Sequence, residues 1–419
     1  MGSHPDLGLR PDGADQTILV HVSGHDRPGV TAALMARLAD ADAEVFDVEQ
    51  ITIRQRLHLS VLITVPAGRD LLKELLFFGW ERQLQVDFEV VDHTPADEPS
   101  APCFAVTLLG QRLDGRHLAA AATAIAEHRA NIDRITCLAR YPVTCYELAV
   151  SAPDIAALRT ALMAAGAEQG FDVAVQRDGL SRRALRLVAI DVDSTLIRDE
   201  VIDLLAAEAG CGAEVARITE SAMSGELAFG DALAARVALL AGLDAEALER
   251  ARRRLRLTPG ARTFVRTLRS LGFRVAILSG GFTAFTDSLR DDLGVDYAFA
   301  NELEIIDGRL TGRVVGPIID RARKASLLAE IAHLEGIDLA QTVAVGDGAN
   351  DLDMLAVAGL GIAFNAKAVV RAAADTALTV PYLDAILFVL GLRRIDVESV
   401  GTADRPVAPA PAVRPPAPA

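Results

Sequence analysis

The sequence predicts a doubly wound α/β domain, built on a mostly parallel sheet, that follows two smaller α+β modules. From about residue 185 onward, short continuous apolar segments alternate with helical patterns, as in a parallel sheet that helices cover on both faces. Before that point, the order strand, helix, strand, strand, helix, strand occurs twice, in residues 16–94 and 101–178. That order is typical of a ferredoxin-like fold. We therefore expect two ferredoxin-like α+β modules and a Rossmann-type α/β core.

The elements of the two modules can be followed along the chain. In the first module, TILVHVS (residues 17–23) predicts a strand, GHDRPGV a turn and TAALMARLADADA a helix. Two further strands, the helical segment LLKELLFFGWERQL and a strand DFEVVDH follow. The second module begins with a strand, CFAVTLL (residues 103–109), and repeats this order.

The remaining boundaries come from composition and pattern. Residues 1–15 are polar and rich in Gly, Pro and Asp, and residues 402–419 are rich in Pro and Ala, so we expect both segments to be disordered. The α/β core is expected over residues 183–396. A helical insert, or cap, is expected within it over about residues 200–256.

The overall composition is that of an ordinary globular protein. The 419 residues carry a formal net charge of -15, and 51% of them are hydrophobic. Because that charge would repel a polyanion, the sequence argues against a nucleic-acid partner and an anionic membrane surface. The N-terminus lacks the apolar segment of a signal peptide, and the apolar stretch at residues 383–392 is too short to span a bilayer. We therefore expect a cytoplasmic protein whose four cysteines stay reduced.

The strongest chemical signal is a pair of carboxylates directly after a buried strand. Asp191 and Asp193 follow the apolar segment LRLVAI and begin the sequence DVDSTL. In parallel sheets the chemistry lies at the carboxyl ends of the strands, so one carboxylate could attack phosphorus while the other moves a proton. A carboxylate is ionised at neutral pH and needs no base to activate it. The alternative is that both acids cap the helix that follows.

Three weaker signals lie later in the chain. The dipeptide Ser279-Gly280 follows the strand segment FRVAIL, where a hydroxyl and free backbone N–H groups could hold phosphate oxygens. Lys324, near the start of a helix, could place a point charge on a phosphate. The segment GDGAND contains Asp347, Asn350 and Asp351, and its carboxylates are hard oxygen ligands that suit magnesium. Taken singly, the first and third features also fit an ordinary turn and a helix capped by Asn350, and Lys324 alone fits a solvated surface lysine better than a phosphate ligand.

In order and context, these signals resemble those of the haloacid dehalogenase superfamily, over about residues 185–392. The resemblance implies that Asp191 is the nucleophile and that Asp193 is first the general acid and then the base. It also implies that Mg²⁺ is held by the carboxylates of Asp191 and Asp347 and by the backbone carbonyl of Asp193. The phosphate would be bound by Ser279, Gly280, Lys324 and Asn350. Asp351 would support the site from behind the metal ligands.

The helical insert resembles the cap of the phosphoserine phosphatases within that superfamily. The resemblance rests on Glu200, on the segment MSGELAF (residues 223–229) and on Arg236. It implies that Glu200 binds the substrate's ammonium group and Arg236 its carboxylate, while Met223 and Phe229 close an apolar lid. One acid and one base match a zwitterion, and Arg offers a bidentate fork to a carboxylate. Taken singly, these residues also fit a helix-start acid, a surface arginine and two core side chains.

The first module resembles the ACT domain, which often binds an amino acid and controls the enzyme attached to it. The resemblance rests on the loop GHDRPGV, in which Gly24, Asp26, Arg27 and Gly29 could receive an amino acid such as L-serine at the start of a helix. A plain turn without a ligand is the other interpretation. The second module's loop, GQRLDGRH, lacks the Arg-Pro-Gly sequence. Because ACT-like sheets commonly pair between chains, the resemblance implies a homodimer.

Three functional hypotheses follow. The first is Mg²⁺-dependent hydrolysis of O-phospho-L-serine to L-serine and phosphate through an aspartyl-phosphate, the last step of L-serine biosynthesis, regulated by an amino acid. The second is hydrolysis of another small phosphate monoester, such as phosphohomoserine. The third is an amino-acid-sensing protein with a vestigial phosphatase site. The presence of Asp191, Asp193, Lys324 and Asp347 argues against the third hypothesis, because a degenerate site should have lost at least one of them.

Overall fold

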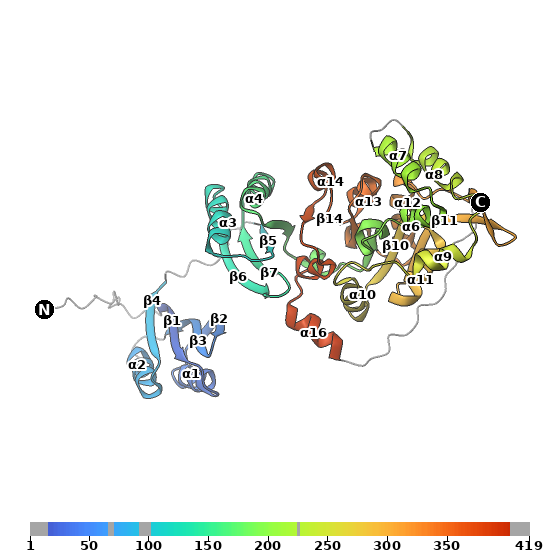
Figure 1. Ribbon diagram of the computed structural model, residues 1–419. Helices are drawn as coiled ribbons and strands as arrows, with labels where there is room; N and C mark the ends of the chain where they lie inside the picture. The colour runs from blue at the N-terminus through green and yellow to red at the C-terminus, as the bar shows by residue number, and fades with distance from the viewer. Residues whose placement is uncertain (1–15, 66–70, 92–101, 224–226, 403–419) are drawn as a thin grey trace. The chain divides into compact units, whose positions relative to one another are not determined.

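The computed structural model describes residues 16–65, 71–91, 102–223 and 227–402 (Figure 1). The chain forms two compact units, an N-terminal unit of Met1–Ser100 and a C-terminal unit of Ala101–Ala419. The two segments predicted to be disordered lie outside the described residues, apart from Thr402. No helix in the described part of the chain is long and apolar enough to cross a membrane.

The N-terminal unit has the predicted element order of the first module. Its antiparallel sheet has the strand order β2-β3-β1-β4. Alternate residues of β1 face the core, where Ile18, Val20 and Val22 are buried. The described elements are β1 (Gln16–His25), α1 (Val30–Asp40), β2 (Glu44–Ile53), β3 (Arg56–Val65), α2 (Leu71–Arg82) and β4 (Gln85–Val90).

The C-terminal unit begins with the second module, which repeats the same order. Aspartates cap both of its helices. The Asp114 carboxylate accepts a hydrogen bond from the N–H of Arg116 at the start of the first helix, and the Asp154 carboxylate accepts hydrogen bonds from N–H groups at the start of the second. The elements are β5 (Cys103–Gly110), α3 (Gly115–Glu127), β6 (Asn131–Ala139), β7 (Thr144–Ser151), α4 (Ile155–Gln169) and β8 (Asp172–Arg177).

The α/β core follows in the same unit, as a sheet with the strand order β12-β11-β10-β9-β13-β14-β15. Its strands are β9 (Leu187–Ile190), β10 (Arg274–Phe282), β11 (Tyr297–Ile306), β12 (Arg309–Val315), β13 (Thr342–Gly346), β14 (Leu360–Phe364) and β15 (Thr376–Leu378). All pairs are parallel except β11 with β12, which form an antiparallel hairpin. Asp307 and Gly308 at its turn both have positive φ, 50° and 73°.

Helices cover both faces of this sheet, which confirms the doubly wound fold. Val188 and Ile190 of β9 belong to one apolar cluster with Phe264 of α10, whereas Leu187 and Ala189 belong to another with the helices on the opposite face. The flanking helices are α10 (Ala261–Ser270), α11 (Thr283–Leu293), α12 (Arg321–Leu334), α13 (Leu352–Val357), α14 (Ala368–Ala373) and α15 (Ile386–Val389). The short α5 (Leu180–Arg183) precedes the core and α16 (Arg394–Thr402) follows it.

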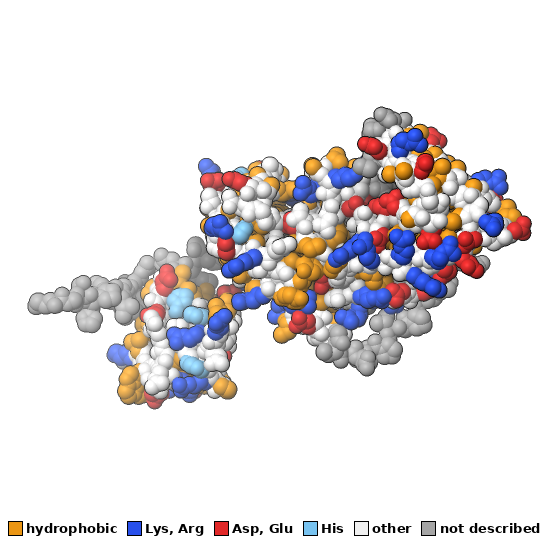
Figure 2. Space-filling model, in the orientation of Figure 1, with side chains coloured by type: hydrophobic (Ala, Val, Ile, Leu, Met, Phe, Trp, Pro, Cys, Tyr) orange, Lys and Arg blue, Asp and Glu red, His pale blue; other side chains and the backbone are white. Residues whose placement is uncertain are grey.

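The predicted helical insert lies between β9 and α10. Its helices are α6 (Val201–Ala209), α7 (Gly212–Met223), α8 (Phe229–Ala238) and α9 (Glu246–Arg252). On the face of the C-terminal unit seen in Figure 2, acidic and basic side chains are interspersed.

The second module and the α/β core share one sheet, which the sequence did not indicate. Strand β8 pairs antiparallel with β15 where Ala174 lies opposite Thr376, and this joins the two sheets into one of 11 strands. Side chains reinforce the junction. The Asp172 carboxylate accepts hydrogen bonds from the backbone N–H and the hydroxyl of Thr379, at 2.7 and 3.0 Å. The exact domain boundaries therefore stay a prediction, since two of the predicted domains form one compact unit.

Candidate active site

The carboxyl end of β9 places two acids in one site. The N–H of Asp191 still donates to the carbonyl of Val345 on β13, at 2.9 Å, so Asp191 is held at the sheet's edge. The chain then turns through a short helical segment, η1 (Val192–Leu196), in which Ser194 takes a positive φ of 57°. This turn lets the Asp193 carboxylate accept hydrogen bonds from the Val201 N–H at 2.8 Å and the Ser279 hydroxyl at 3.3 Å. The predicted pair therefore lies where β9 and β10 end, and Asp193 also holds the first N–H of the helix that begins at Val201.

Lys324 is buried between two carboxylates. Its Nζ lies 2.5 Å from Oδ1 of Asp191 and 2.7 Å from Oδ1 of Asp351. Lys324 and Asp351 are fully buried, and Asp191 is only 2% exposed. Burial by itself lowers the pKa of Lys324, but the two carboxylates outweigh this effect and raise it above its ordinary value. Lys324 is therefore a fixed positive charge at Asp191 and not a surface residue.

Three carboxylates gather at the same edge of the sheet. Among the described residues, Asp191, Asp347 and Asp351 offer oxygen atoms that lie within 4.8 Å of one another. The Thr195 hydroxyl donates to Asp347 at 3.1 Å. Burial first, and then the charges of Asp351 and Glu200, raise the pKa of Asp347 to about 7. The cluster therefore holds more negative charge than Lys324 offsets.

The two oxygens of Asp351 are both engaged inside the protein. Oδ1 receives Lys324, and Oδ2 accepts a hydrogen bond from the N–H of Gly348 at 3.0 Å. This approach depends on Gly346, because a Cβ atom there would lie 2.4 Å from Cγ of Asp351. Asn350 is half-buried in the same turn.

The last residues of β10 close the site from the other side. Ser279 is fully buried, and its hydroxyl accepts a hydrogen bond from the N–H of Gly281 at 2.8 Å. A Cβ atom at Gly281 would lie 3.0 Å from the Asp193 carboxylate, so only glycine allows this close approach. A Cβ atom at Gly280 would lie 3.2 Å from the ring of Phe229, which places that cap side chain over the segment.

The cap brings Glu200 and Arg236 to this site as well. The Ser194 hydroxyl donates to Glu200 at 2.7 Å, which ties the start of α6 to the turn after β9. Arg236 donates to the carbonyl of Ala232 at 3.2 Å and to the Thr219 hydroxyl at 3.4 Å. Burial lowers the pKa of Arg236, and the charge of Glu200 opposes that shift. The side chain of Met223 and the residues that follow it, 224–226, lie outside the described residues.

Asn301, on β11, is a site residue that sequence reasoning missed. It is 1% exposed. Its Nδ2 donates to the carbonyl of Gly280, and its Oδ1 accepts from the N–H of Ile319, both at 2.8 Å. Ile319 directly precedes Asp320, which caps the helix that carries Lys324. Asn301 therefore ties the Ser279 segment to the start of α12. The available signal was a polar residue within the apolar segment YAFANELEII.

The predicted ligand loop of the first module contains an uncapped helix start. Helix α1 begins after Gly29, which has a φ of 90° and makes no side-chain cap, while the Asp26 carboxylate instead accepts a hydrogen bond from the Thr52 hydroxyl at 3.2 Å. At the equivalent place in the second module, Asp114 caps α3. The start of α3 in the second module is thus capped by a carboxylate of the chain itself, whereas the N–H groups at the start of α1 in the first module have no side-chain cap. Gly24 lies at the end of β1, where a Cβ atom would meet Leu84 at 2.5 Å, and Arg27 is exposed.

Comparisons with known proteins agree with this architecture. Residues 188–356 match the haloacid dehalogenase-like hydrolase family, and residues 16–89 and 103–176 each match ACT domain families. A phosphoserine phosphatase of Streptomyces coelicolor is 53% identical over 389 residues, covering 92% of this chain and 95% of that protein. The chain belongs to the phosphoserine phosphatase family.

Two further matches cover 93% and 68% of the chain. The phosphoserine phosphatase SerB2 of Mycobacterium tuberculosis is 46% identical, covering 93% of this chain and 97% of that protein. A solved structure of a HAD family hydrolase from Salmonella enterica serovar Typhi is 30% identical with a TM-score of 0.60, covering 68% of this chain and 98% of the other. The predicted family and fold class are confirmed, so the chain is a hydrolase of phosphatase type with two ACT domains. The roles of individual residues stay predictions.

Proposed function

We propose that the chain hydrolyses O-phospho-L-serine to L-serine and inorganic phosphate through an aspartyl-phosphate on Asp191. The observation that carries this proposal is the buried contact of 2.5 Å between Asp191 and Lys324, beside an Asp193 that is hydrogen-bonded to Ser279. A carboxylate nucleophile, a proton carrier and a fixed cation at one strand end are the parts that phosphoryl transfer to a side chain needs. The full-length relatives named phosphoserine phosphatase support the substrate.

The carboxylate cluster fits a divalent cation. Asp191 and Asp347 present oxygens within 4.8 Å of each other, and hard oxygen donors suit Mg²⁺. Because both oxygens of Asp351 are engaged by Lys324 and Gly348, we assign the ligands to Asp191, Asp347 and the backbone carbonyl of Asp193, with Asp351 holding Lys324 in place. Bound Mg²⁺ would neutralise charge on the phosphate and let an anionic nucleophile approach it.

The protein's own groups account for the two steps. In the first, a carboxylate oxygen of Asp191 attacks phosphorus, the bond between phosphorus and the serine oxygen breaks, and protonated Asp193 gives its proton to that oxygen. In the second, a water attacks phosphorus, Asp193 takes its proton, and the bond between phosphorus and Asp191 breaks. Burial first, and then the charge of Glu200, raise the pKa of Asp193 to about 7, so it can both give and take a proton near neutral pH.

The same geometry suggests how a phosphorylated amino acid would lie. Lys324, Ser279, Asn350 and the backbone of Gly280 would hold the phosphate. Glu200 would receive the ammonium group and Arg236 the carboxylate, because one acid and one guanidinium near the reacting end match a zwitterion. Phe229, which lies over Gly280, would help exclude water. The part assigned to Met223 falls outside the described residues.

A phosphate-release panel tests the proposal. Initial rates with O-phospho-L-serine, O-phospho-L-threonine and phosphohomoserine are compared at matched concentrations, with Mg²⁺ and with EDTA. We expect the highest kcat/KM for phosphoserine and no turnover in EDTA. Preference for phosphohomoserine, or for an ester without the amino or carboxylate group, would replace the substrate assignment. Equal activity in wild type and Asp191→Asn would refute the nucleophile.

Regulation and assembly complete the proposal. As the last step of L-serine biosynthesis, the reaction is suited to feedback, and we infer that L-serine or another amino acid binds at the uncapped α1 start near Gly24, Asp26, Arg27 and Gly29. Calorimetry on Asp191→Asn, with L-serine and with Arg27→Ala as the comparison, tests this.

A homodimer is supported by β2, an edge strand that exposes Val45, Phe46, Val48, Ile51 and Ile53. Light scattering should show a dimer that Ile51→Lys weakens.

A further inference from the structure

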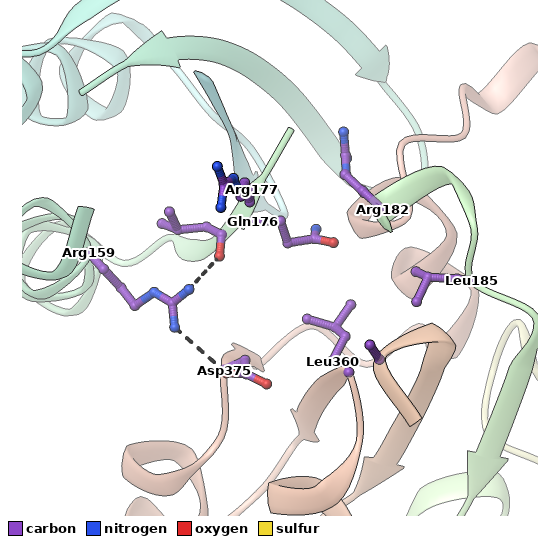
Figure 3. Close-up of a pocket in the computed structure, with 10 residues that line it drawn as sticks. Arg159, Gln176, Arg177, Arg182, Leu185, Leu360 and Asp375 are labelled. Atoms are coloured by element: carbon purple, nitrogen blue, oxygen red, sulfur yellow. Dashed lines mark hydrogen bonds and ion pairs between the residues drawn. The ribbon is translucent and has the colours of Figure 1, made fainter. Parts of the chain in front are cut away.

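A cavity of about 270 Å³ lies at the junction between the second ACT domain and the α/β core. Its walls come from α4 and β8 on the ACT side and from the starts of β14 and β15 on the core side, as Figure 3 shows for Arg159, Arg177, Leu360 and Asp375. We call it the seam cavity. It is separate from the proposed active site, because its residues do not include any of the acids at the ends of β9 and β13.

The charged groups of the seam cavity favour an anion. Arg159 donates to the carbonyl of Val175 at 2.9 Å, and its other nitrogen lies 3.7 Å from Asp375, so this ion pair leaves donors unused. Arg177 is exposed and has no ion pair with any residue in the described part of the chain. Two guanidinium groups thus face one carboxylate. The third arginine, Arg182, is already engaged by Glu147 at 2.5 Å.

The rest of the lining is apolar except for Gln176, whose amide donates to the carbonyl of Val389 at 2.8 Å. Val175 and Leu185 are buried on the ACT side and in the connecting segment, and Leu360 is buried at the start of β14. A space of this size, with a few charged groups at one side and aliphatic side chains at the other, matches a small amphipathic molecule. The local charge at the seam cavity is positive, whereas the whole chain carries a net charge of -15. The overall composition therefore does not account for the arginines gathered there.

We propose that the seam cavity is a binding site for a small aliphatic carboxylate. The ligand's carboxylate contacts the guanidinium groups of Arg159 and Arg177, each of which can donate two hydrogen bonds in a planar fork. Its aliphatic body lies against Val175 and Leu360. Oδ2 of Asp375 already accepts a hydrogen bond from the N–H of Gly361 at 2.8 Å, so its Oδ1, 3.7 Å from Arg159, is the oxygen that would receive an ammonium group if the ligand carries one. Because the cavity has walls from both sides of the junction, the bound ligand holds the ACT domain against the core and stabilises the folded chain by mass action.

Three probes that share one carbon skeleton separate the chemical classes: isovalerate, L-valine and isovaleramide, which are an anion, a zwitterion and a neutral amide. Each is titrated into the full-length chain by calorimetry, with the unfolding temperature as a second readout. We expect isovalerate or L-valine to bind saturably and to raise the Tm, and isovaleramide to bind at least about tenfold more weakly, as the loss of one charge-assisted hydrogen bond implies. Tighter L-valine identifies an amino acid, and tighter isovalerate identifies a carboxylate without the amino group.

Arg177→Gln locates the binding, because Arg177 is exposed and its loss should not impair folding. Arg134→Gln is the matched control, since Arg134 is an exposed arginine on β6, at the far edge of the ACT sheet from β8. We expect Arg177→Gln to weaken binding about tenfold or more and Arg134→Gln to leave it unchanged, with phosphatase turnover in the absence of probe equal in both. The proposal is wrong if neither charged probe binds, if the amide binds as tightly, or if the two variants behave alike.

Discussion

Replacement of Lys324 by methionine tests the electrostatics of the site most sharply. Lysine occurs at only three positions, 73, 324 and 367, among 42 Lys and Arg residues. At position 324 its ammonium group lies between Asp191 and Asp351, and all three side chains are buried. Methionine keeps the length of the stem and removes the charge, which leaves two buried carboxylates without their partner. Loss of one member of a buried ion pair costs about 3–5 kcal/mol of unfolding free energy.

The cost should depend on pH in a direction that the structure fixes. Burial and Asp351 already raise the pKa of Asp191, and Lys324 is the group that opposes that shift. Without Lys324, the folded-state pKa of Asp191 lies still further above its unfolded value, so the folded state binds a proton more tightly. Stability is therefore gained as pH falls through the folded pKa of Asp191, by up to about 1.4 kcal/mol per pH unit. The deficit of Lys324→Met should be largest near pH 8 and shrink toward pH 5.

Urea unfolding at pH 5, 6.5 and 8, in EDTA and followed by circular dichroism, measures this deficit. Lys367→Met is the control, because Lys367 is exposed and its replacement should change stability by no more than about 0.5 kcal/mol. A deficit below about 1 kcal/mol at pH 8, or one that grows as pH falls, would refute the reasoning.

Three further predictions concern the reaction. Asp193→Asn should lower kcat with phosphoserine about 10²–10⁴-fold, and should lower the first-turnover burst with p-nitrophenyl phosphate far less, because nitrophenolate leaves without a proton; equal losses would contradict Asp193 as the proton donor. Arg236→Gln should raise the KM for phosphoserine by about tenfold or more but leave that for O-phosphoethanolamine, which has no carboxylate, unchanged. Asn301→Asp keeps the acceptor for the N–H of Ile319 but loses the donor to the carbonyl of Gly280, so kcat/KM should fall about tenfold or more. Asn301→Gln, which keeps both kinds of group, should recover part of that kcat/KM. Steady-state kinetics and the Tm of each variant measure this, and a change in Tm alone would make Asn301 merely structural.

Much of the site could be predicted because its residues follow strands with clear patterns. The alternation of Val188 and Ile190 with Leu187 and Ala189 marks a strand buried on both faces, and parallel strands bring their carboxyl ends to one edge. Asp191, Ser279 and Asp347 therefore had to lie close together once β9, β10 and β13 were recognised. The order of strands and helices likewise predicted both ACT domains, because each strand and helix can be recognised from short-range periodicity in the sequence.

Long-range pairing accounts for what the sequence did not indicate. A single residue pair, Ala174 with Thr376, connects the ACT sheet to the core sheet, and such a contact leaves no periodic signature. Asn301 acts through two backbone groups that are distant in sequence, so it could be noticed only as a polar residue in an apolar strand. The charge of Lys324 was expected at a helix start, but its burial between two carboxylates depends on the packing of α12 against the strand ends.

Trapping the phosphoenzyme tests the central claim most directly. Wild-type chain is mixed with O-phospho-L-serine and Mg²⁺, quenched in acid within the first turnover, and reduced with borohydride, which converts an acyl phosphate of aspartate into homoserine. Peptide mass spectrometry then locates the reduced residue. We predict homoserine at position 191 in the wild type and none in Asp191→Asn. Reduction at Asp193, or phosphate on Ser194 or Thr195 with Asp191 unmodified, would contradict the account.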